Sequence, residues 1–580
     1  MPRWRKATPA AAPATVQCQP GLAPTVSDNA VAVVWFKWSD LRTADHEPLH
    51  AAHACGLPLV YLHVYDPVWT QGKSPIGGFP RTGPARLKFW RESVEDLRST
   101  LGTLRVVEKA TAEAFAELAR EVEIAAVYAY DDFCDEEIQM TAAAKKAAGS
   151  APFHLFWHGL TLNSKQDLPP IASLPELYKP YKNAVGRSHI RDPLPRPVGL
   201  KLGSARIEPM TRHDAGEVTR PDGLPGRERW QGGESVALRF LDDYIAASGP
   251  ALYVGSSDSM HPGERNAVNA TTRLSPWLAF GCVSPRTVQA EVSKFEQKRG
   301  KTRASYWIYH ELIFRDFFRL MCLKWGNRVF QLGGPFGVKG LEWTRDMTLV
   351  RRWIEGRTGF PFVDAGMREL ATTGFCSHLH RQTCASFLVR DLGVDWRIGA
   401  EYFESVLVDY TPDANWGNWA YRILPRQELL PLCKKHLTTL EILSWPYVHD
   451  SKGAHIRRWV PELANAEPDD LREPWRHRGK AQKVDVTPKR DSPYWFTSVM
   501  RVNWPEYQQM MSGFAWMVKP GEGLEGYERP MVPPLLLEVD LGKIPLDHDW
   551  GKPKGAGKGG GAGKGKGKGK GKGYGKGQNR

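Results

Sequence analysis

The sequence predicts an α/β domain followed by an all-α domain, and three observations lead to this fold class. Apolar runs alternate with helical stretches over residues 29–160, whereas helical periodicity dominates residues 234–465. The length of 580 residues exceeds that of a usual single domain, and an apolar fraction of 42% is enough for two cores. No run of about 18 apolar residues is present, so no membrane span is expected.

The first domain is predicted to contain a Rossmann-like, doubly wound parallel sheet. The run AVAVVWF near its start is typical of a buried strand, and PLVYLHVYD of a second strand after a loop and a helix. The pattern then predicts a helix, a strand, a helix and a strand over residues 82–101, 104–107, 110–121 and 124–130. Strands that alternate with helices favour parallel pairing. This domain has neither GxGxxG nor a P-loop, so a dinucleotide or NTPase site is not supported there.

The remaining segments are assigned by their composition. Residues 161–233 are rich in Pro, Arg and Asp with weak periodicity, which indicates an interdomain connector. Residues 466–550 form an irregular C-terminal extension to which no role is assigned. Residues 1–28 and 551–580 are both expected to be disordered, because neither has the apolar content to form a core.

The last segment, 551–580, carries most of the net charge. Its nine Lys and one Arg, with no acid, contribute +10 of the formal +14. Such a flexible polycation can neutralise the phosphates of DNA or RNA without reading their sequence. A tail that only keeps the protein in solution is the alternative.

The N-terminal segment and the cysteines bear on location. Residues 1–28 are basic and Ala/Pro/Thr-rich without an acid before Asp28, like a plastid or mitochondrial transit peptide, and they lack the apolar stretch of a secretory signal. An ordinary disordered terminus is the alternative. The eight cysteines form no CxxC pair, which favours a reducing compartment and no metal or disulfide framework. We expect an intracellular protein of the chloroplast or mitochondrion, with the nucleus as the alternative.

The segment NATTRLSPWLAFGCVSPRTV is a candidate anion site. Thr271, Thr272 and Ser275 precede a helix that is predicted to begin at Pro276 or Trp277. Hydroxyls and backbone N–H groups at a helix start suit a diphosphate, because the N–H donors there have no partner within the helix and the helix dipole favours anions. The alternative is an ordinary Ser cap followed by Pro at the first helical position.

Other polar residues recur in the helical domain. Glu311 and Arg315 are four positions apart on one predicted helix face, where a simple ion pair is the alternative. Arg381 and Asp409 are candidates for a bidentate bridge. Asn415 follows in the crowded segment DYTPDANWGNW, where Asn can also serve only to form a turn.

Several long motifs together resemble one known family. SPWLAFGCVSPR, ELIFRDFF, GRTGFPFVDAGMREL, DWRIGAEYFES and NWGNWAY are similar to the photolyase/cryptochrome flavoproteins, and WFKWSDLRTADHEPL is similar to their antenna domain. CASFLVRDLGVDWRIGAEYFE and NWGNWAY most resemble the DASH cryptochrome branch. The resemblance covers residues 31–463, with gaps, and implies a photolyase α/β antenna domain linked to a helical FAD-binding domain.

The resemblance implies FAD in the helical domain. Arg381 and Asp409 would pair beside the isoalloxazine ring, and Asn415 would face flavin N5, where Asn suits a stable, fully reduced flavin. The other implied FAD-binding residues are Thr271, Thr272, Arg273, Leu274, Ser275, Glu311, Arg315, Tyr410 and Thr411. The implied electron-transfer chain is Trp343, Trp396 and Trp419, for each of which core packing is the alternative.

The resemblance further implies repair of cyclobutane pyrimidine dimers, preferentially in single-stranded DNA, by light-driven electron transfer from reduced FAD. Glu311, Asn415 and His378 are the implied catalytic residues, and Arg265, Phe314, Gln382 and Tyr421 the implied DNA contacts. The alternatives are a blue-light photoreceptor without repair activity and six-four repair that uses His378. These stay open because Phe314, His378 and Leu379 depart from the family's usual Trp, Asn and Arg, and because Gln382 stands where six-four photolyases have a second catalytic His.

A second chromophore is also implied. Asp132, in AYDDFCDEE, aligns with the Glu that this branch uses to bind a 5,10-methenyltetrahydrofolate antenna, although a surface turn is the alternative. The expected partner is damaged DNA, and the chain is expected to be a monomer.

Overall fold

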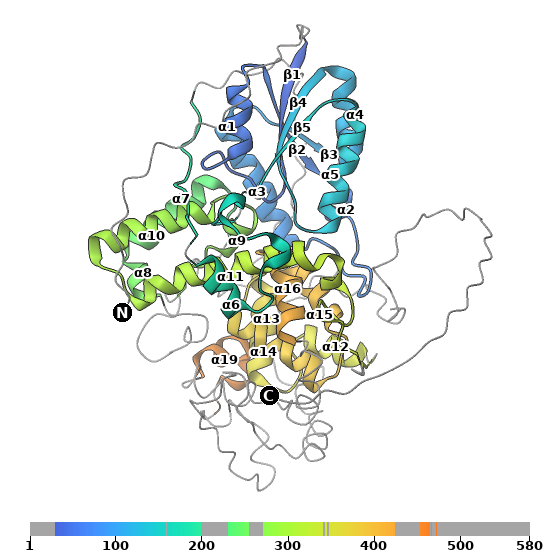
Figure 1. Ribbon diagram of the computed structural model, residues 1–580. Coiled ribbons are helices and arrows are strands. Elements are labelled where there is room, and N and C mark those ends of the chain that lie inside the picture. Colours follow the sequence, from blue (N-terminus) through green and yellow to red (C-terminus); the bar gives the residue numbers. More distant parts are fainter. Residues whose placement is uncertain are drawn as a thin grey trace, which may run out of the picture.

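The computed structural model describes residues 29–198, 230–253, 271–423 and 450–471, except for gaps at 158, 160, 187, 340–342, 345–346, 451–452, 465 and 467–470. Arg265, the predicted transit segment, the basic tail and most of the 466–550 extension lie outside these residues. Within the described ranges, an α/β part (blue to teal) adjoins a helical part (green to orange), as Figure 1 shows. No helix of the described residues is long and apolar enough to cross a membrane.

The α/β part is built on a five-stranded parallel sheet, as predicted. The order is β3-β2-β1-β4-β5, with β1 (Ala30–Phe36), β2 (Leu59–Tyr65), β3 (Arg105–Glu108), β4 (Glu123–Tyr130) and β5 (Phe153–Phe156). Every residue of β1 is buried, because helices cover both faces of the sheet and favour a continuous apolar strand. The doubly wound, Rossmann-like arrangement is therefore confirmed.

Alternate side chains of the strands enter two different cores. Val31, Val33 and Trp35 of β1 pack in one core with Phe115 of α4 (Thr111–Glu121) and Ala144 of α5 (Asp135–Ala147). The opposite face packs with α1 (Glu47–Ala54) and α3 (Pro84–Leu101) in a core that continues into the helical part. A short helix α2 (Pro67–Thr70) follows β2. This continuous core makes the α/β part a rigid support for the helical part.

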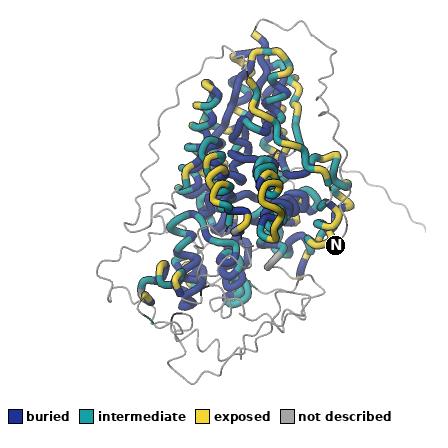
Figure 2. The backbone as a smooth tube through the Cα atoms, turned by 90° about the vertical axis from the view of Figure 1, so that its left-hand side faces the viewer, coloured by how far each residue is buried: buried dark blue, intermediate teal, exposed yellow. Residues whose placement is uncertain are grey.

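The helical part contains the expected all-α domain. Its helices are α7 (Glu234–Ala246), α8 (Gly249–Leu252), α9 (Ser275–Ala279), α10 (Pro285–Arg299), α11 (Arg303–Trp325), α12 (Met347–Ile354), α13 (Pro361–Thr373), α14 (His378–Ser386), α15 (Trp396–Val406), α16 (Pro412–Ile423) and α19 (Ala454–Trp459). Every residue of α15 is buried, so this helix lies at the centre of the domain. Figure 2 shows the buried residues running through the interior of both parts.

Part of the predicted connector is helical. Two 3-10 turns, Lys165–Asp167 and Ile171–Ser173, precede α6 (Tyr178–Val185). Tyr181 of α6 packs edge-on against Phe317 of α11, with their ring centroids 5.1 Å apart. The connector is thus anchored on the helical domain over this stretch, which its weak sequence periodicity did not indicate.

A buried carboxylate joins the connector to both parts. Arg191 and Arg286 donate to the two oxygens of Asp45 at 2.7 and 2.9 Å, and Arg42 lies beside it. Burial opposes ionisation of Asp45, but these three guanidinium groups outweigh it and lower its pKa to about 2. Asp45 is therefore ionised at neutral pH.

Glu401 of α15 joins the two parts at a second place. Its carboxylate accepts hydrogen bonds from the backbone N–H groups of Ile76, at 3.0 Å, and Gly77, which belong to the loop between α2 and α3. Burial raises the pKa of Glu401 to about 7, although these hydrogen bonds act in the opposite direction. The folded protein thus binds a proton at Glu401 more tightly than the unfolded chain does.

This raised pKa predicts a pH-dependent stability. Because the folded pKa of Glu401 lies above the unfolded one, its contribution is complete below about pH 4.3 and is lost as the pH rises towards 7. We expect Glu401→Gln to cost less stability relative to wild type at pH 8 than at pH 5. Denaturant unfolding of both proteins at the two pH values measures this difference. A cost that is the same at both pH values would contradict the raised pKa.

Candidate functional site

The helical domain has a cavity between α14, α15 and α16 that is partly open to solvent and has about 580 Å³ of empty space, counting the solvent at its mouth. The side chains that line it are His378, Arg381, Gln382, Ala385, Phe403, Leu407, Asp409, Tyr410, Thr411, Ala414, Asn415, Asn418 and Trp419. Eight of these were candidate site residues in the sequence, and they come from two separate stretches, 378–382 and 409–419.

Arg381 and Asp409 form an ion pair, but through one carboxylate oxygen and not as the bidentate bridge that the sequence predicted. Arg381 Nη2 lies 2.9 Å from Asp409 Oδ2, and Nε donates to the carbonyl of Cys376 at 2.9 Å. Burial disfavours the Arg381 charge, but Asp409 outweighs it and raises the pKa of Arg381. The second oxygen, Asp409 Oδ1, is buried and accepts no hydrogen bond from the described residues. A ligand N–H in this cavity would satisfy that oxygen.

Two asparagines of α16 face the same cavity. The side-chain amide of Asn415 donates to the carbonyl of Ala400 at 2.8 Å, which fixes its orientation. Asn418, one helical turn further, donates to the carbonyl of Ala414 at 2.8 Å, and its Oδ1 is buried and accepts no hydrogen bond within the described structure. Sequence reasoning singled out Asn415 and missed Asn418, although the spacing of three in NWGNW places both on one helix face.

The three candidate relay tryptophans lie on different elements of the domain: Trp343 precedes α12, Trp396 begins α15 and Trp419 belongs to α16. Trp419 lines the cavity and is buried, and its ring packs on the backbone of Gly399, one turn after Trp396 on α15. Trp396 is fully buried and donates to the carbonyl of Leu332 at 2.9 Å. Trp343 is half-buried, and its neighbour Thr344 pairs with the segment just before Trp396 through Gly393 at 2.7 Å.

Gly399 makes room for Trp419. A Cβ atom at this position would lie 2.3 Å from the indole ring, which is closer than any real contact. Gly→Ala inside a helix normally adds about 0.5–1 kcal/mol of stability. Here we expect Gly399→Ala to destabilise by about 1–3 kcal/mol, because the overpacked indole must move. Denaturant unfolding gives the sign directly, and a stabilised variant would show that the ring does not depend on this glycine.

The predicted anion-binding turn lies beside α11. Residues 271–274 lead into α9, which begins at Ser275 rather than at Pro276 or Trp277. Arg273 has a positive φ of 50°, and Arg315 of α11 donates to the carbonyl of Leu278 in α9 at 2.6 Å. Burial, together with nearby Arg319, lowers the pKa of Arg315 to about 9, so an anion beside this guanidinium would be stabilised. None of these residues, nor Glu311 of α11, lines the cavity.

Four of the candidate catalytic and DNA-contacting residues fall into two groups. His378 and Gln382, one turn apart at the start of α14, line the cavity. Phe314 and Tyr421 are half-buried in an aromatic cluster outside its lining, with Phe314 4.3 Å from Tyr178 between ring centroids. The Tyr421 hydroxyl accepts a hydrogen bond from the backbone N–H of Tyr178 at 3.2 Å. The two aromatic residues are therefore held by α6 and α11.

A second cavity, of about 360 Å³, lies at the carboxyl ends of β1, β2 and β4. Asp132 lines it and is buried, but its Oδ2 already contacts Lys37 Nζ and the Thr141 hydroxyl. Glu137 lines the same cavity and was missed by sequence reasoning. Burial, with Asp132 and Glu136 nearby, raises the pKa of Glu137 well above its usual range.

Comparisons with known proteins agree with these two parts. Residues 32–198 match the family described as DNA photolyase, and residues 307–503 match the FAD binding domain of DNA photolyase. Cryptochrome DASH of Xenopus laevis is 35% identical over 498 residues, which cover 82% of this chain and 91% of that protein. A protein of Arabidopsis thaliana named cryptochrome DASH, chloroplastic/mitochondrial, is 35% identical over 459 residues, which cover 75% of this chain and 76% of that protein.

Solved structures show the same architecture. A cryptochrome of Synechocystis sp. PCC6803 superposes with a TM-score of 0.67 at 30% identity, covering 84% of this chain and 99% of that one. An archaeal photolyase from Sulfolobus tokodaii, solved with two FAD molecules, shares the fold with a TM-score of 0.60 at 22% identity, covering 83% of this chain and 99% of that one. The chain thus carries a FAD-binding domain, and it belongs to the photolyase/cryptochrome family, where it is most like the DASH cryptochromes.

Proposed function

We propose that the chain is a DASH-type photolyase that binds FAD in the α14–α16 cavity and repairs cyclobutane pyrimidine dimers, preferentially in single-stranded DNA. The observation that carries this proposal is the cavity itself, which combines the Arg381–Asp409 pair, Asn415 and Trp419 with His378 and Gln382. One cavity thus joins groups suited to a flavin with polar groups suited to a substrate.

The residues present fit a flavin. Asp409 Oδ1 and Asn418 Oδ1 are two buried acceptors that would take hydrogen bonds from a heteroaromatic ring with N–H groups. Arg381 would balance negative charge on the ring, and Asn415, held by Ala400, would keep a fixed amide beside it. Arg315 and the turn over residues 271–275 would hold the phosphates. When bound and reduced, FAD supplies the light-excited electron donor, while the protein supplies placement and electrostatics.

The remaining candidate residues would serve electron supply and substrate binding. Trp343, Trp396 and Trp419 lead from a half-buried position to the cavity and would conduct electrons to it. His378 and Gln382 would contact a dimer flipped out of the strand, and a single-stranded dimer leaves its stack at least cost. Glu311, Phe314 and Tyr421 would complete the substrate side, and Arg265 would contact DNA. The Lys-rich tail would contact the phosphates of DNA or RNA.

A blue-light photoreceptor without repair activity is the second candidate function. His378 stands where the resemblance leads us to expect Asn, and it lines the cavity directly, so the substrate side differs where contact with a lesion would occur. His378 could also serve as a proton donor in six-four repair. The names of the Arabidopsis thaliana and Oryza sativa relatives support a chloroplast or mitochondrial location for this chain.

Blue-light repair assays separate these functions. Reduced, FAD-loaded protein is mixed with oligonucleotides that carry one cyclobutane dimer or one six-four photoproduct, each single-stranded and in a duplex. We expect light-dependent loss of the cyclobutane dimer, faster in the single strand. Normal flavin photoreduction without repair of any lesion would favour the photoreceptor and refute the photolyase assignment, whereas repair of the six-four lesion alone would assign His378 to that chemistry.

For the antenna, we propose that the cavity at the carboxyl ends of the strands holds a methenyltetrahydrofolate, with Glu137 as well as Asp132 in contact. Glu137 Oε1 is buried without a hydrogen-bond partner among the described residues, whereas Asp132 is engaged by Lys37. We expect gently purified protein to absorb in the near-UV beyond its flavin, and Glu137→Ala to lose that band but keep the flavin. A wild-type spectrum that flavin alone accounts for would contradict this proposal.

A further inference from the structure

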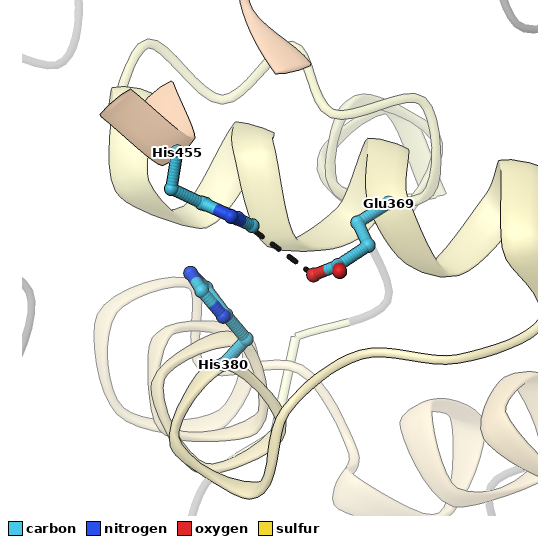
Figure 3. A group of neighbouring side chains, drawn as sticks. All are labelled: Glu369, His380 and His455. Atoms are coloured by element: carbon cyan, nitrogen blue, oxygen red, sulfur yellow. Dashed lines mark ion pairs between the residues drawn. The ribbon is translucent and has the colours of Figure 1, made fainter. Parts of the chain in front are cut away.

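Three side chains from three helices converge away from the cavity lining. Glu369 of α13, His380 of α14 and His455 of α19 point toward one another in Figure 3, and one potential ligand atom from each lies within 4.8 Å of the others. Two imidazoles and one carboxylate are a donor set that binds Zn²⁺ and related divalent transition metals. Among the described residues, this is the one group of three or more His, Cys, Asp or Glu side chains with such geometry.

The distances favour ligands around an ion over a direct ion pair. His455 Nε2 lies 3.7 Å from Glu369 Oε2, whereas a charge-assisted hydrogen bond would be about 2.7–2.9 Å. Two atoms bound tetrahedrally to Zn²⁺ at about 2.0–2.1 Å lie about 3.4 Å apart. All three potential ligand atoms lie within 4.8 Å of one another, so changes in separation of about 1.4 Å or less bring them to this spacing.

The surroundings hold the two imidazoles in place. His380 is 1% exposed, and its ring lies between Phe362 at 4.6 Å and His455 at 4.2 Å, measured between centroids. Gly366 allows this approach, since a Cβ there would lie 3.0 Å from the ring. Ser377 Oγ lies 2.9 Å from His380 Nδ1, the kind of outer contact that orients a metal-binding imidazole.

The third ligand is positioned by the start of α19. Asp450 accepts hydrogen bonds from the backbone N–H groups of His455 at 3.1 Å and Ile456 at 2.9 Å. Ile456 and Trp459 pack with Phe362 and Leu379 in a separate small core, so α19 is docked on α13 and α14. Contacts on α14 and α19 thus hold the two imidazoles.

We propose that Glu369, His380 and His455 bind one Zn²⁺ ion. The ion would bridge α13, α14 and α19 and leave one coordination position for water, since three protein ligands occupy three of four tetrahedral positions. His380 adjoins Arg381, which pairs with Asp409 in the cavity, and His378 and Gln382 lie within the same turn. The ion would therefore fix the part of α14 that forms the cavity wall.

The test uses flavin-loaded, full-length protein without a histidine tag. After treatment with a chelator and addition of one equivalent of Zn²⁺, elemental analysis of the gel-filtered wild type is expected to find about one Zn²⁺ per chain. His455→Gln and Glu369→Gln are expected to weaken zinc binding by more than the about 10–100-fold cost of losing an outer-shell partner. Zinc should raise the Tm of the wild type and leave that of His455→Gln unchanged.

His378→Gln is the matched control, because it removes a neighbouring imidazole outside the trio and is expected to keep the zinc. The absorbance of the bound flavin shows whether a variant is folded. It therefore distinguishes a variant that lost only a zinc-binding side chain from one that did not fold. A wild type that retains no zinc, a His455→Gln variant that binds as tightly as wild type, or loss of zinc in His378→Gln would each overturn the assignment.

Discussion

Asp409→Asn is expected to be purified with little or no bound flavin. The substitution keeps the shape of the side chain but removes the charge that pairs with Arg381 at 2.9 Å, and it replaces one of two carboxylate acceptors by a donor. A charge-assisted hydrogen bond is worth about 1.5–3 kcal/mol, which corresponds to a loss in flavin affinity of about 10–150-fold. The flavin-to-protein absorbance ratio and a titration with FAD measure this loss.

Asp413→Asn is the matched control for Asp409→Asn. Asp413, four residues further along the chain, forms an ion pair with Arg319 at 2.8 Å that is more fully buried than the Arg381–Asp409 pair, but it does not line the cavity. We expect it to lower the free energy of unfolding, because Arg319 loses its charged partner, while flavin affinity stays near that of wild type. Equal flavin loss in both variants would show that general destabilisation, and not contact with the ligand, is the cause.

Trp396→Phe is expected to abolish most of the photoreduction of the bound flavin while leaving the flavin in place. Trp396 is fully buried and is the middle member of the proposed path from the half-buried Trp343 to the cavity-lining Trp419, so its loss would interrupt that path. Phe keeps most of the buried apolar volume but is much harder to oxidise. The decay of the oxidised flavin absorbance under blue light, with an external thiol reductant, measures the rate.

Trp353→Phe controls for the loss of a buried indole. Trp353 is also fully buried, donates to the carbonyl of Cys384 at 2.9 Å and stacks on Phe403, which lines the cavity. We expect this variant to photoreduce its flavin at close to the wild-type rate. If Trp353→Phe and Trp396→Phe slowed photoreduction equally, the path would not run through Trp396.

The sheet could be predicted from the sequence, and much of the cavity could be predicted only by resemblance. The strands of the first domain are short apolar runs between helices, and their length together with this alternation favours the strands of a parallel sheet. Arg381 and Asp409 are 28 residues apart, and no local periodicity links them. The family resemblance implied that this pair lies beside a flavin, and in the structure both side chains line the same cavity.

Other features depended on contacts that no local pattern indicates. Glu401 meets the loop at Ile76 across 325 residues of sequence, so its raised pKa is a tertiary property. Glu369, His380 and His455 come from three helices, and no spacing that is typical of a metal site links them in the sequence. Asn418 is the exception, because its spacing of three from Asn415 can be read directly from the sequence.

The most direct test of the proposed photolyase is the number of cyclobutane dimers that each FAD-loaded molecule removes from a single-stranded oligonucleotide under blue light. Chromatography of the oligonucleotide before and after illumination counts intact dimers, and an identical sample kept in the dark sets the baseline. We predict repeated turnover that requires light and is lost in Asp409→Asn. An oligonucleotide that keeps all its dimers, beside flavin that is normally photoreduced in the same sample, would contradict the proposal.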